Sequence, residues 1–253
     1  MKRLIVNADD LGRAPGINAG VLRAHREGIV TAATLMVAAP ATDEAARLAR
    51  ATPSLDVGVH LTLTYGRPVS DPSRVPSLVE PDGTFPRGPG ALVADRVQRD
   101  EALIEYRAQY ARARDLIGRA PTHLDSHHWT HDAPALEWAI AELATETGAA
   151  VRPHDDAQRD RLRARGIRTV DHYRRDFQHD GHVDVAALER ILADLAGGVT
   201  ELGCHPGEPD AELARTSAYA ALRVDELATL TDPRARAALA RNAIALGDYG
   251  ALA

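Results

Sequence analysis

The chain has 253 residues, with 45% apolar residues, 26% charged residues and a formal net charge of −6. These proportions are ordinary for a soluble globular protein, and the negative charge argues against partners such as nucleic acid or an anionic membrane surface. No run reaches the ~18 apolar residues of a membrane span, and the apolar run before Asn7 is too short for a secretory signal, so we expect a cytoplasmic protein without membrane insertion.

Strand-like and helix-like segments alternate along the first third of the chain. Residues 2–8 are aliphatic and predict a buried strand, followed by a helix from residue 15 that stops at Gly28. Residues 31–38 and 55–63 predict two further strands. The segment between them, residues 41–51, predicts a helix with Thr42 or Asp43 as its N-cap.

Residues 66–90 differ from the rest because they are rich in Pro, Gly, Ser and Asp. A loop of this length in a compact domain is often functional, so it is a candidate lid over a site or a candidate subunit contact in a homodimer. A tolerated surface insertion is the alternative interpretation, because loops accept insertions freely.

The alternation continues to the end of the chain. Residues 91–117, 133–147 and 184–197 predict helices, and short strands are expected at 149–153, 167–173, 198–204 and 242–246. We find no internal repeat and no break in composition. The pattern therefore predicts an α/β fold in which residues 1–253 form a single domain around a parallel sheet, open or closed into a (β/α) barrel, with the insertion at 66–90.

Acidic and imidazole side chains gather where the predicted strands end. In parallel α/β folds the ligand site lies at the carboxyl ends of the strands. Four separate strands deliver such groups to that end of the sheet, namely Asp9 with Asp10, His60, His127 with His128, and His205. We therefore expect these side chains to meet in one site.

The stretch "NADDLG" places two carboxylates side by side. Neighbours on a regular strand point to opposite faces, so Asp9 and Asp10 serve one site only where the strand breaks, and Gly12 permits such a turn. Adjacent carboxylates repel one another and so favour a bound cation or a shared proton. In the alternative reading, Asp10 caps the next helix and Asp9 is solvated.

The stretch "PTHLDSHHWTH" holds four of the eleven histidines of the chain together with Asp125. If it is a strand, residues 123, 125 and 127 share one face. Imidazole and carboxylate are the usual ligands of an ion such as Zn²⁺, and a catalytic site needs about three of them. The remaining side chains would orient the ligands or contact substrate. A polar surface turn, and a core position for His60, are the alternatives.

The stretch "CHPG" puts His205 at a strand end, before a tight turn. With no acidic neighbour before Glu208, His205 suits a general acid better than a metal ligand. Cys204, the only cysteine, excludes an intrachain disulfide and points away from His205 on a strand, so we interpret it as a packing residue.

Four motifs carry a family resemblance: "NADDLG", "GVHLTLTYGRP", "PTHLDSHHWTH" and "ELGCHPG". In this order and at these separations they resemble the YdjC-like carbohydrate deacetylases, over almost the whole chain from Arg3 to about Tyr249. The resemblance includes enzymes that remove N-acetyl groups from chitooligosaccharides and a branch assigned to hopanoid biosynthesis. It implies an irregular (β/α) barrel of the glycoside hydrolase/deacetylase type.

The resemblance also implies roles for five residues. Asp10, His60 and His127 would hold a divalent cation, Asp9 would be the catalytic base and His205 the acid. The family's cation is often assigned as Mg²⁺, but two imidazoles favour Zn²⁺ or another transition metal at least as much. The implied reaction is hydrolysis of the N-acetyl group of a sugar or oligosaccharide, with release of acetate.

Six further residues are candidates for orienting the ligands or contacting substrate: His123, Asp125, His128, Trp129, His131 and Arg152. Trp129 stands where many family members have a third consecutive histidine, and Leu11 where the family often has Phe. A tryptophan at the mouth of a site can stack on a sugar face.

Three other functions stay open at this level. The same ligands would serve a phosphodiesterase, for which Arg13, Arg67 and Arg152 are candidate phosphate contacts. A metal-dependent isomerase or lyase would stabilise an enolate and release no acetate. A protein that only binds sugar or metal is the weakest alternative, because it has no use for an acid–base pair.

Overall fold

The computed structural model describes residues 1–208 and 210–252. The described strands are β1 (Lys2–Leu11), β2 (Ala32–Leu35), β3 (Asp56–Leu61), β4 (His123–Ser126), β5 (Ala150–Val151), β6 (His172–Arg174), β7 (Gly198–Cys204) and β8 (Ile244–Leu246). The described α-helices are α1 (Pro15–Glu27), α2 (Thr42–Ala51), α3 (Arg99–Ile117), α4 (Pro134–Thr147), α5 (Asp156–Ala164), α6 (Val185–Ala193), α7 (Ala211–Thr216), α8 (Ala220–Thr231) and α9 (Pro233–Arg241). Strand and helix alternate, as the sequence predicts.

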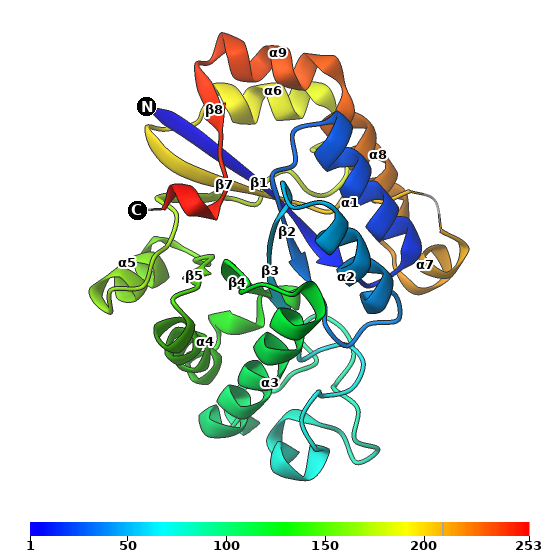
Figure 1. Ribbon diagram of the computed structural model, residues 1–253, viewed down its shortest axis with the longest axis vertical. Helices are drawn as coiled ribbons and strands as arrows, with labels where there is room; N and C mark the ends of the chain where they lie inside the picture. Colours follow the sequence, from blue (N-terminus) through cyan, green and yellow to red (C-terminus); the bar gives the residue numbers. More distant parts are fainter. Residues whose placement is uncertain (209, 253) are drawn as a thin grey trace.

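All strands pair in parallel, in the order β5-β4-β3-β2-β1-β7-β6, while β8 pairs with the start of β1. Residues 167–171 link the two outer edges of this curled sheet. The N–H of Val151 in β5 donates to the carbonyl of Arg168, at 2.9 Å, and the N–H of Asp171 donates to the carbonyl of Val199 in β7, also at 2.9 Å. The prediction of an irregular (β/α) barrel is therefore confirmed, and Figure 1 shows the helices around the outside of the curved sheet.

Alternation along each strand separates an apolar outer face from a polar interior. In β1, Leu4, Val6 and Ala8 belong to the large apolar cluster that the helices cover, whereas Ile5 packs in a small interior cluster. That small cluster closes one end of the barrel with Ala32, Ala150, Val170, Tyr249 and Leu252. Above it, the interior positions carry polar side chains.

The interior polar residues are almost completely buried. They include Asn7, Asp9, Thr34, His60, His123, Asp125, Arg152 and Glu201, none more than 4% exposed. Two glycines make room for them: a Cβ on Gly58 would lie 2.4 Å from the carbonyl oxygen of His123, and a Cβ on Gly203 would lie 2.5 Å from the hydroxyl of Tyr173. Since buried polar groups are costly unless paired, this interior must work as a connected network.

Two details of the sequence prediction are wrong. The helix expected from residue 91 begins at Arg99, because residues 91–98 form only turns and a short 3₁₀ segment before the extended Gln98. Thr42 and Asp43 are not N-caps. Ala41 precedes the helix, and the Thr42 hydroxyl instead donates to the carbonyl of Met36 at 2.7 Å.

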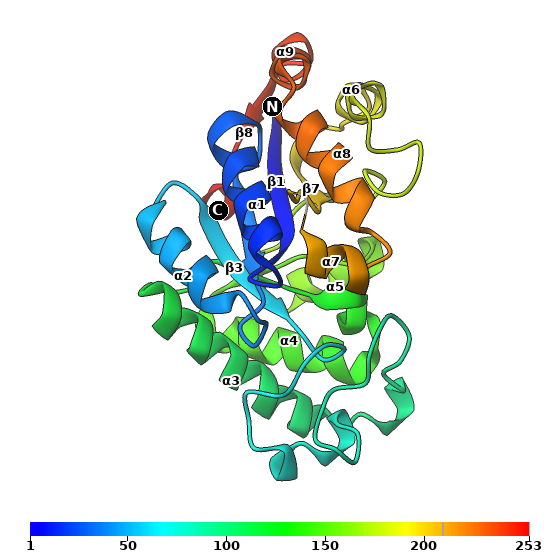
Figure 2. The same ribbon diagram turned by 90° about the vertical axis from the view of Figure 1, so that its right-hand side faces the viewer.

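The segment between β3 and α3 is the long insertion expected from its composition. Two short 3₁₀ turns, Pro72–Arg74 and Pro76–Leu78, are its first regular structure. The segment lies beside α3 at the end of the molecule opposite α9, where Figure 2 shows it in cyan. Glu105 of α3, which is 0% exposed, accepts hydrogen bonds from the N–H groups of Val69 and Ser70, both at 2.9 Å.

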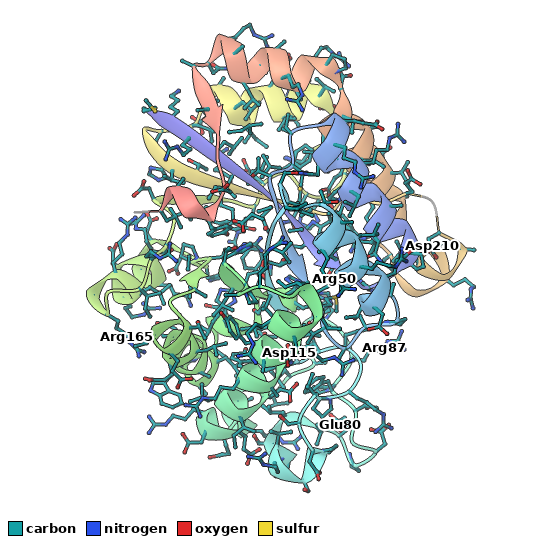
Figure 3. The ribbon with its side chains drawn as sticks, in the orientation of Figure 1. Arg50, Glu80, Arg87, Asp115, Arg165 and Asp210 are labelled. Carbon is teal, nitrogen blue, oxygen red and sulfur yellow. The ribbon has the colours of Figure 1, made fainter. Side chains whose placement is uncertain are left out.

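Charged side chains lie on the outer helices, and that of Asp115 on α3 is 69% exposed. Figure 3 labels Asp115 on α3 and Arg165 after α5 at this surface. Among the described helices, none combines the length and apolarity that crossing a membrane requires.

Candidate metal centre and catalytic site

Asp10 leaves the regular strand conformation. Its φ is 66°, and the register between β1 and β2 shifts between Ala8 and Leu11. The left-handed region is costly for most residues but tolerated by Asp. The break that the adjacent carboxylates require thus lies at Asp10 itself, followed by Gly12 at φ 97°, and it lets Asp9 and Asp10 both line one cavity.

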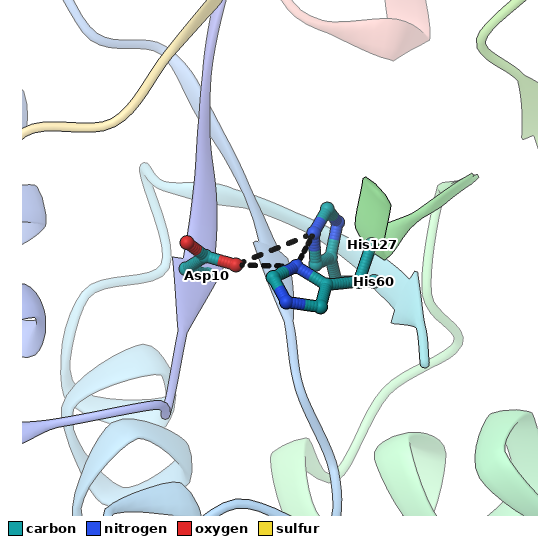
Figure 4. Close-up of side chains that lie close together, drawn as sticks. All are labelled: Asp10, His60 and His127. Atoms are coloured by element: carbon teal, nitrogen blue, oxygen red, sulfur yellow. Dashed lines mark hydrogen bonds and ion pairs between the residues drawn. The ribbon is translucent and has the colours of Figure 1, made fainter. Parts of the chain in front are cut away.

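Asp10, His60 and His127 come together from three different segments. Figure 4 shows Asp10 of β1, His60 of β3 and His127, which follows β4, pointing toward one another. Asp10 Oδ1 lies 3.0 Å from His127 Nδ1 and 3.4 Å from His60 Nε2, and the two imidazole nitrogens are 3.3 Å apart. Each residue offers one donor atom, and all three atoms lie within 4.8 Å of one another.

This cluster fits a divalent cation. Asp10 Oδ1, an atom of this cluster, is buried without a hydrogen-bond partner among the described residues. A buried polar atom without a partner is costly, and a bound cation relieves that cost. One carboxylate and two imidazoles are also the type of donor set found at catalytic zinc sites with an open position.

His60 is oriented from behind by Asp125. Its Nδ1 lies 2.7 Å from Asp125 Oδ1, so Nδ1 donates to this carboxylate and Nε2 faces Asp10 and His127. Burial opposes the charge of His60, but Asp125 and Asp10 outweigh it and raise its pKa to about 10. A cation that binds here must therefore displace a proton, which makes binding pH-dependent.

Charges around Asp10 keep it ionised. Burial raises the pKa of this carboxyl, but His127 and Arg223 outweigh burial and hold the pKa well below its usual range. Arg223 NH2 donates to Asp10 Oδ2, and Arg13 NH1 lies 3.5 Å from the same oxygen. The two arginines thus occupy Oδ2 and leave Oδ1 for the cluster.

Arg152 organises the carboxylates beneath the cluster. Its guanidinium makes two bonds to Asp9, at 2.7 and 2.8 Å, one to Asp125 at 2.8 Å and one to Glu201 at 2.6 Å. A second group of possible ligands, Asp9, His60 and Asp125, therefore already has a cation in Arg152. Burial raises the pKa of Glu201 to about 7, although Arg152 opposes that shift.

His205 faces Asp9 across the cavity. Its Nε2 lies 3.8 Å from Asp9 Oδ2, and its side chain is 18% exposed, the most accessible of the five central residues. The imidazole therefore reaches both the cavity and the carboxylate. Cys204 is buried, and its thiol donates to the carbonyl of Asn7 at 3.3 Å, which agrees with a packing role.

Two of the remaining histidines lie below the cavity. His123 is 0% exposed, stacks on Tyr249 with ring centroids 3.7 Å apart, and its Nε2 lies 2.9 Å from Asn7 Oδ1. His131, also 0% exposed, bridges the Ser126 hydroxyl at 2.5 Å and the Arg152 carbonyl at 3.2 Å. Neither lines the cavity, so both orient other groups and have no direct route to substrate.

His128 and Trp129 do line the cavity, and both have left-handed backbone, with φ values of 57° and 59°. His128 Nδ1 lies 2.9 Å from the Thr64 hydroxyl, and burial lowers the pKa of His128 to about 3. The Trp129 ring lies 5.1 Å from that of Tyr173. Such backbone strain is typical of functional loops, where the surrounding structure holds it in place.

The cavity has a volume of about 490 Å³. Its walls come from every part of the site: Asp9, Asp10, Arg13, His60, Thr64, Tyr65, residues 87–89, Ser126, His127, His128, Trp129, Gln178, His179, His205, residues 217–219 and Arg223. Residues 87–89 belong to the 66–90 insertion. A second cavity of about 540 Å³ shares Tyr65 and Arg87 with the first and continues over Ala38, Gly66 and Phe85.

Helix α8 supplies residues that the sequence analysis missed. Arg223 contacts Asp10, while Glu226 contacts His205 and Tyr219. Their spacing, with Tyr219 four residues before Arg223 and seven before Glu226, is a polar stripe on one helix face, and that was the available signal. Nothing in the sequence indicated that this face would be turned toward the first strand.

Comparison with known proteins places this geometry in a family. A family model described as YdjC-like protein matches residues 3–241. The chain belongs to the YdjC-like protein family. This confirms the resemblance drawn from the four motifs. Two metal-ligand candidates, Asp10 and His60, and the acid candidate His205 all lie within the matched part of this YdjC-like chain.

Relatives of this YdjC-like chain match it over almost its full length. A Geobacillus stearothermophilus protein named carbohydrate deacetylase is 42% identical over 97% of this chain and 96% of its own. A Salmonella paratyphi B protein named chitooligosaccharide deacetylase is 35% identical over 97% of both chains.

Solved structures share the fold. An Enterococcus faecalis protein, provisionally described as a cellobiose-phosphate cleavage protein, is 32% identical over 100% of this chain and 99% of its own, with a TM-score of 0.91. A family 4 carbohydrate esterase from Streptomyces lividans, in complex with acetate, covers 98% of this chain and 92% of its own, with a TM-score of 0.54 at 13% identity. The second likeness is one of fold.

Proposed function

We propose that this protein is a metal-dependent carbohydrate N-deacetylase, which hydrolyses the N-acetyl group of an amino sugar or oligosaccharide and releases acetate. The observation that carries the proposal is the meeting of Asp9 and His205, 3.8 Å apart, beside the Asp10–His60–His127 cluster in one cavity. The deacetylase names of relatives up to 42% identical support the same reaction. Residues 1–253 would act as one catalytic domain.

Asp10, His60 and His127 would hold the cation. When bound, it supplies a water of lowered pKa and polarises the acetamide carbonyl. The two imidazoles favour Zn²⁺ or another transition metal, although a carboxylate site also accepts Mg²⁺. Because burial and charge already orient all three donors, little reorganisation is needed on binding.

Asp9 is the proposed base. It accepts the proton of the water whose oxygen attacks the acetamide carbon. Two bonds from Arg152 and one from Asn7 Nδ2, at 2.9 Å, fix the carboxylate at the cavity wall. This anchoring keeps Asp9 in place while the proton moves to it.

His205 is the proposed acid. When the bond between carbon and nitrogen breaks, Nε2 of His205 gives its proton to the departing nitrogen, so that the sugar leaves as an amine and the acyl part as acetate. An amine is a poor leaving group without that proton. A general acid contributes ~10²–10⁴-fold to such a reaction, so loss of His205 should cost this much turnover.

The cavity next to the cluster suits a sugar substrate. Trp129 and Tyr65 present aromatic surface at its walls, and the second cavity across Tyr65 offers room for a further sugar unit. Residues 87–89 of the insertion form part of the wall, which supports a binding role for that loop.

The test is release of acetate. Purified protein is stripped with a chelator, reloaded with Zn²⁺, Mg²⁺, Mn²⁺ or Co²⁺, and incubated with N-acetylglucosamine and its oligomers. We expect metal-dependent acetate release, loss of both metal and activity in His60→Ala, and loss of activity with retention of metal in Asp9→Asn. Full turnover by metal-free His60→Ala would refute the site.

The same experiment separates the other reactions that the sequence leaves open. A phosphodiesterase would release no acetate, and Arg152 is already committed to three carboxylates. An isomerase or lyase would convert a sugar without releasing acetate.

A further inference from the structure

One face of the segment that contains α8 contacts both Asp10, a proposed metal ligand, and His205, the proposed acid. Tyr219, immediately before the helix, lies beside the His205 ring with centroids 5.5 Å apart. Arg223 donates to Asp10 and lies 3.5 Å from the carbonyl of His205. Glu226, one turn further, is 0% exposed. The roles proposed above use none of these three residues.

Glu226 holds the backbone of His205 and lies close to its ring. One oxygen, Oε2, accepts the backbone N–H of His205. The other, Oε1, lies 3.8 Å from the ring nitrogen Nδ1 of the same residue. Nδ1 has no hydrogen-bond partner among the described residues, although it is buried. The carboxylate is therefore the nearest negative group on that side of the imidazole.

Tyr219 holds Glu226 in turn. Its hydroxyl donates to Oε1 at 2.5 Å, so both carboxylate oxygens are engaged and cannot rotate freely. Charge-assisted hydrogen bonds of this kind are among the stronger ones in proteins. The chain of contacts runs from the Tyr219 hydroxyl through Glu226 to His205 and ends at Nε2, 3.8 Å from Asp9.

We propose that Glu226 is a positioning residue for the acid His205, and that Tyr219 fixes Glu226 for this task. The proposal rests on the proposed function, because it requires that His205 protonate the leaving nitrogen. A carboxylate beside Nδ1 favours the tautomer that keeps a proton there. The proton that leaves is then the one on Nε2, which faces the cavity.

A purely structural role for Glu226 predicts something different. If the buried carboxylate only held β7 against α8, its replacement would lower the stability of the protein and impair substrate binding and all catalytic steps alike. A positioning role acts on the protonation step alone, so it should lower kcat while KM and metal content stay close to normal. The effect of replacing Glu226 on kcat should also disappear when His205 is already absent, because the effects of two residues that act as one unit are not additive.

The experiment is a double-mutant cycle on the zinc-loaded full chain. The variants are Glu226→Gln, which keeps the shape and removes the charge, His205→Asn, and the two together, assayed by acetate release from N-acetylglucosamine oligomers. We expect Glu226→Gln to lower kcat about 10- to 100-fold, by analogy with the effect of removing a group that orients a metal ligand. The double variant should be no slower than His205→Asn.

Two further variants guard against misfolding as the explanation. Asp225→Asn makes the same change of charge at the exposed neighbouring position and should keep wild-type kcat. Tyr219→Phe leaves the Glu226 charge in place, removes its hydroxyl donor and should lower kcat by a smaller factor than Glu226→Gln. Zinc content and the urea midpoint are measured for every variant.

Hydrolysis of 4-nitrophenyl acetate adds a second readout. Its phenolate leaves without a proton, so the chelator-sensitive part of this activity should survive Glu226→Gln.

The outcomes are separable. Unchanged kcat in Glu226→Gln, or an equal further loss in the His205→Asn background, overturns the positioning role. Retention of amide hydrolysis by His205→Asn instead removes the acid assignment itself. A wild-type protein that releases no acetate with any metal overturns the proposed function.

Discussion

At the residue scale, the orientation of His60 depends on a carboxylate that would not touch the cation. Asp125 accepts a hydrogen bond from His60 Nδ1. It is itself held by the Thr34 hydroxyl at 3.1 Å and by Arg152 at 2.8 Å. Arg152 and His60 outweigh the burial of Asp125 and keep its pKa below the usual value. An ionised, fixed acceptor behind a ligand imidazole raises the basicity of that ligand.

Asp125→Asn should therefore weaken metal binding about 10- to 100-fold, because an amide is a poorer acceptor for the Nδ1 proton. The measurement is competition for Zn²⁺ against a chromophoric chelator at fixed pH. Asp115→Asn is the control, since Asp115 lies on the outside of α3 with a side chain 69% exposed. Equal zinc affinity in the two variants would contradict the role given to Asp125.

Arg152 is the second residue on which the interior depends. Its replacement by Met would leave Asp9, Asp125 and Glu201 buried without their shared cation. Breaking a buried ion pair costs ~3–5 kcal/mol of unfolding free energy, so Arg152→Met should be strongly destabilised in urea. Arg165→Met, which breaks a pair with Glu142 on the outer surface, should cost only ~0–1 kcal/mol.

At the element scale, helix α3 fixes the long insertion. Glu105 accepts the N–H groups of Val69 and Ser70, so one buried carboxylate ties the start of the loop to the barrel wall. The far part of the same loop, residues 87–89, lines the catalytic cavity. Position of the loop and shape of the cavity are thus linked through α3.

Glu105→Ala should release this anchor. We expect KM for an N-acetylated oligosaccharide to rise about tenfold, the effect of losing ~1.4 kcal/mol of binding, while kcat changes little. Limited proteolysis should cut within residues 66–98 sooner than in wild type. Asp100→Ala, on the same helix with a side chain 81% exposed, should change neither, and a shared effect of both variants would argue against the anchor.

The elements show how far the sequence could lead. Parallel strands bring their carboxyl ends together, so Asp9, His60, His127 and His205 could be gathered on one end from the β/α alternation alone. A break in this strand was expected from the adjacent carboxylates, but its position at Asp10 was not. The left-handed backbone conformation of an Asp has no signature in the sequence.

The contacts of Tyr219, Arg223 and Glu226 could not be inferred from the sequence. They arise because α8 packs beside α1, which brings Arg223 to Asp10 at the end of the first strand. Local sequence patterns do not determine which distant helix face meets a strand end. The late start of α3 has a similar cause, because the segment before it folds against the loop rather than into the helix.

At the scale of the whole molecule, the polar barrel interior makes stability depend on pH. His123 and His131 are both fully buried, and burial lowers the pKa of each to about 4, against a usual value near 6.5. The unfolded chain therefore binds protons between pH 6.5 and pH 4 that the folded chain does not. The stability that these neutral rings provide is complete above pH 6.5 and is lost as the pH falls toward 4.

Each ring should contribute a slope of ~1.4 kcal/mol per pH unit to the unfolding free energy within this window. We expect the unfolding free energy of His123→Gln, measured by urea titration, to change less with pH than that of wild type between pH 4.5 and 6.5. The introduced amide can still donate to Asn7. His182→Gln, which changes an exposed histidine, should keep the wild-type slope. If the unfolding free energies of wild type and His123→Gln changed equally with pH, His123 would be excluded as a source of the pH dependence.

The arrangement of the two cavities determines how long a substrate the protein can accommodate. The second cavity lies across Tyr65 and Arg87 from the metal-ligand cluster, and Arg87 makes no hydrogen bond or ion pair with another described residue. A single sugar bound at the cluster would not reach that space, whereas an oligosaccharide would extend into it. Ala38 is exposed on its wall, so Ala38→Trp fills it with little effect on the core.

Ala38→Trp should raise KM for the N-acetylglucosamine trimer about tenfold, equivalent to ~1.4 kcal/mol of lost contact, because the remote sugar can no longer bind. KM for the monomer and kcat for both should stay at wild-type values, as acetate release over a range of substrate concentrations would show. Ala193→Trp, at the exposed end of α6, adds the same bulk elsewhere and should affect neither substrate. If Ala38→Trp slowed monomer and trimer equally, the second cavity would not be a sugar site.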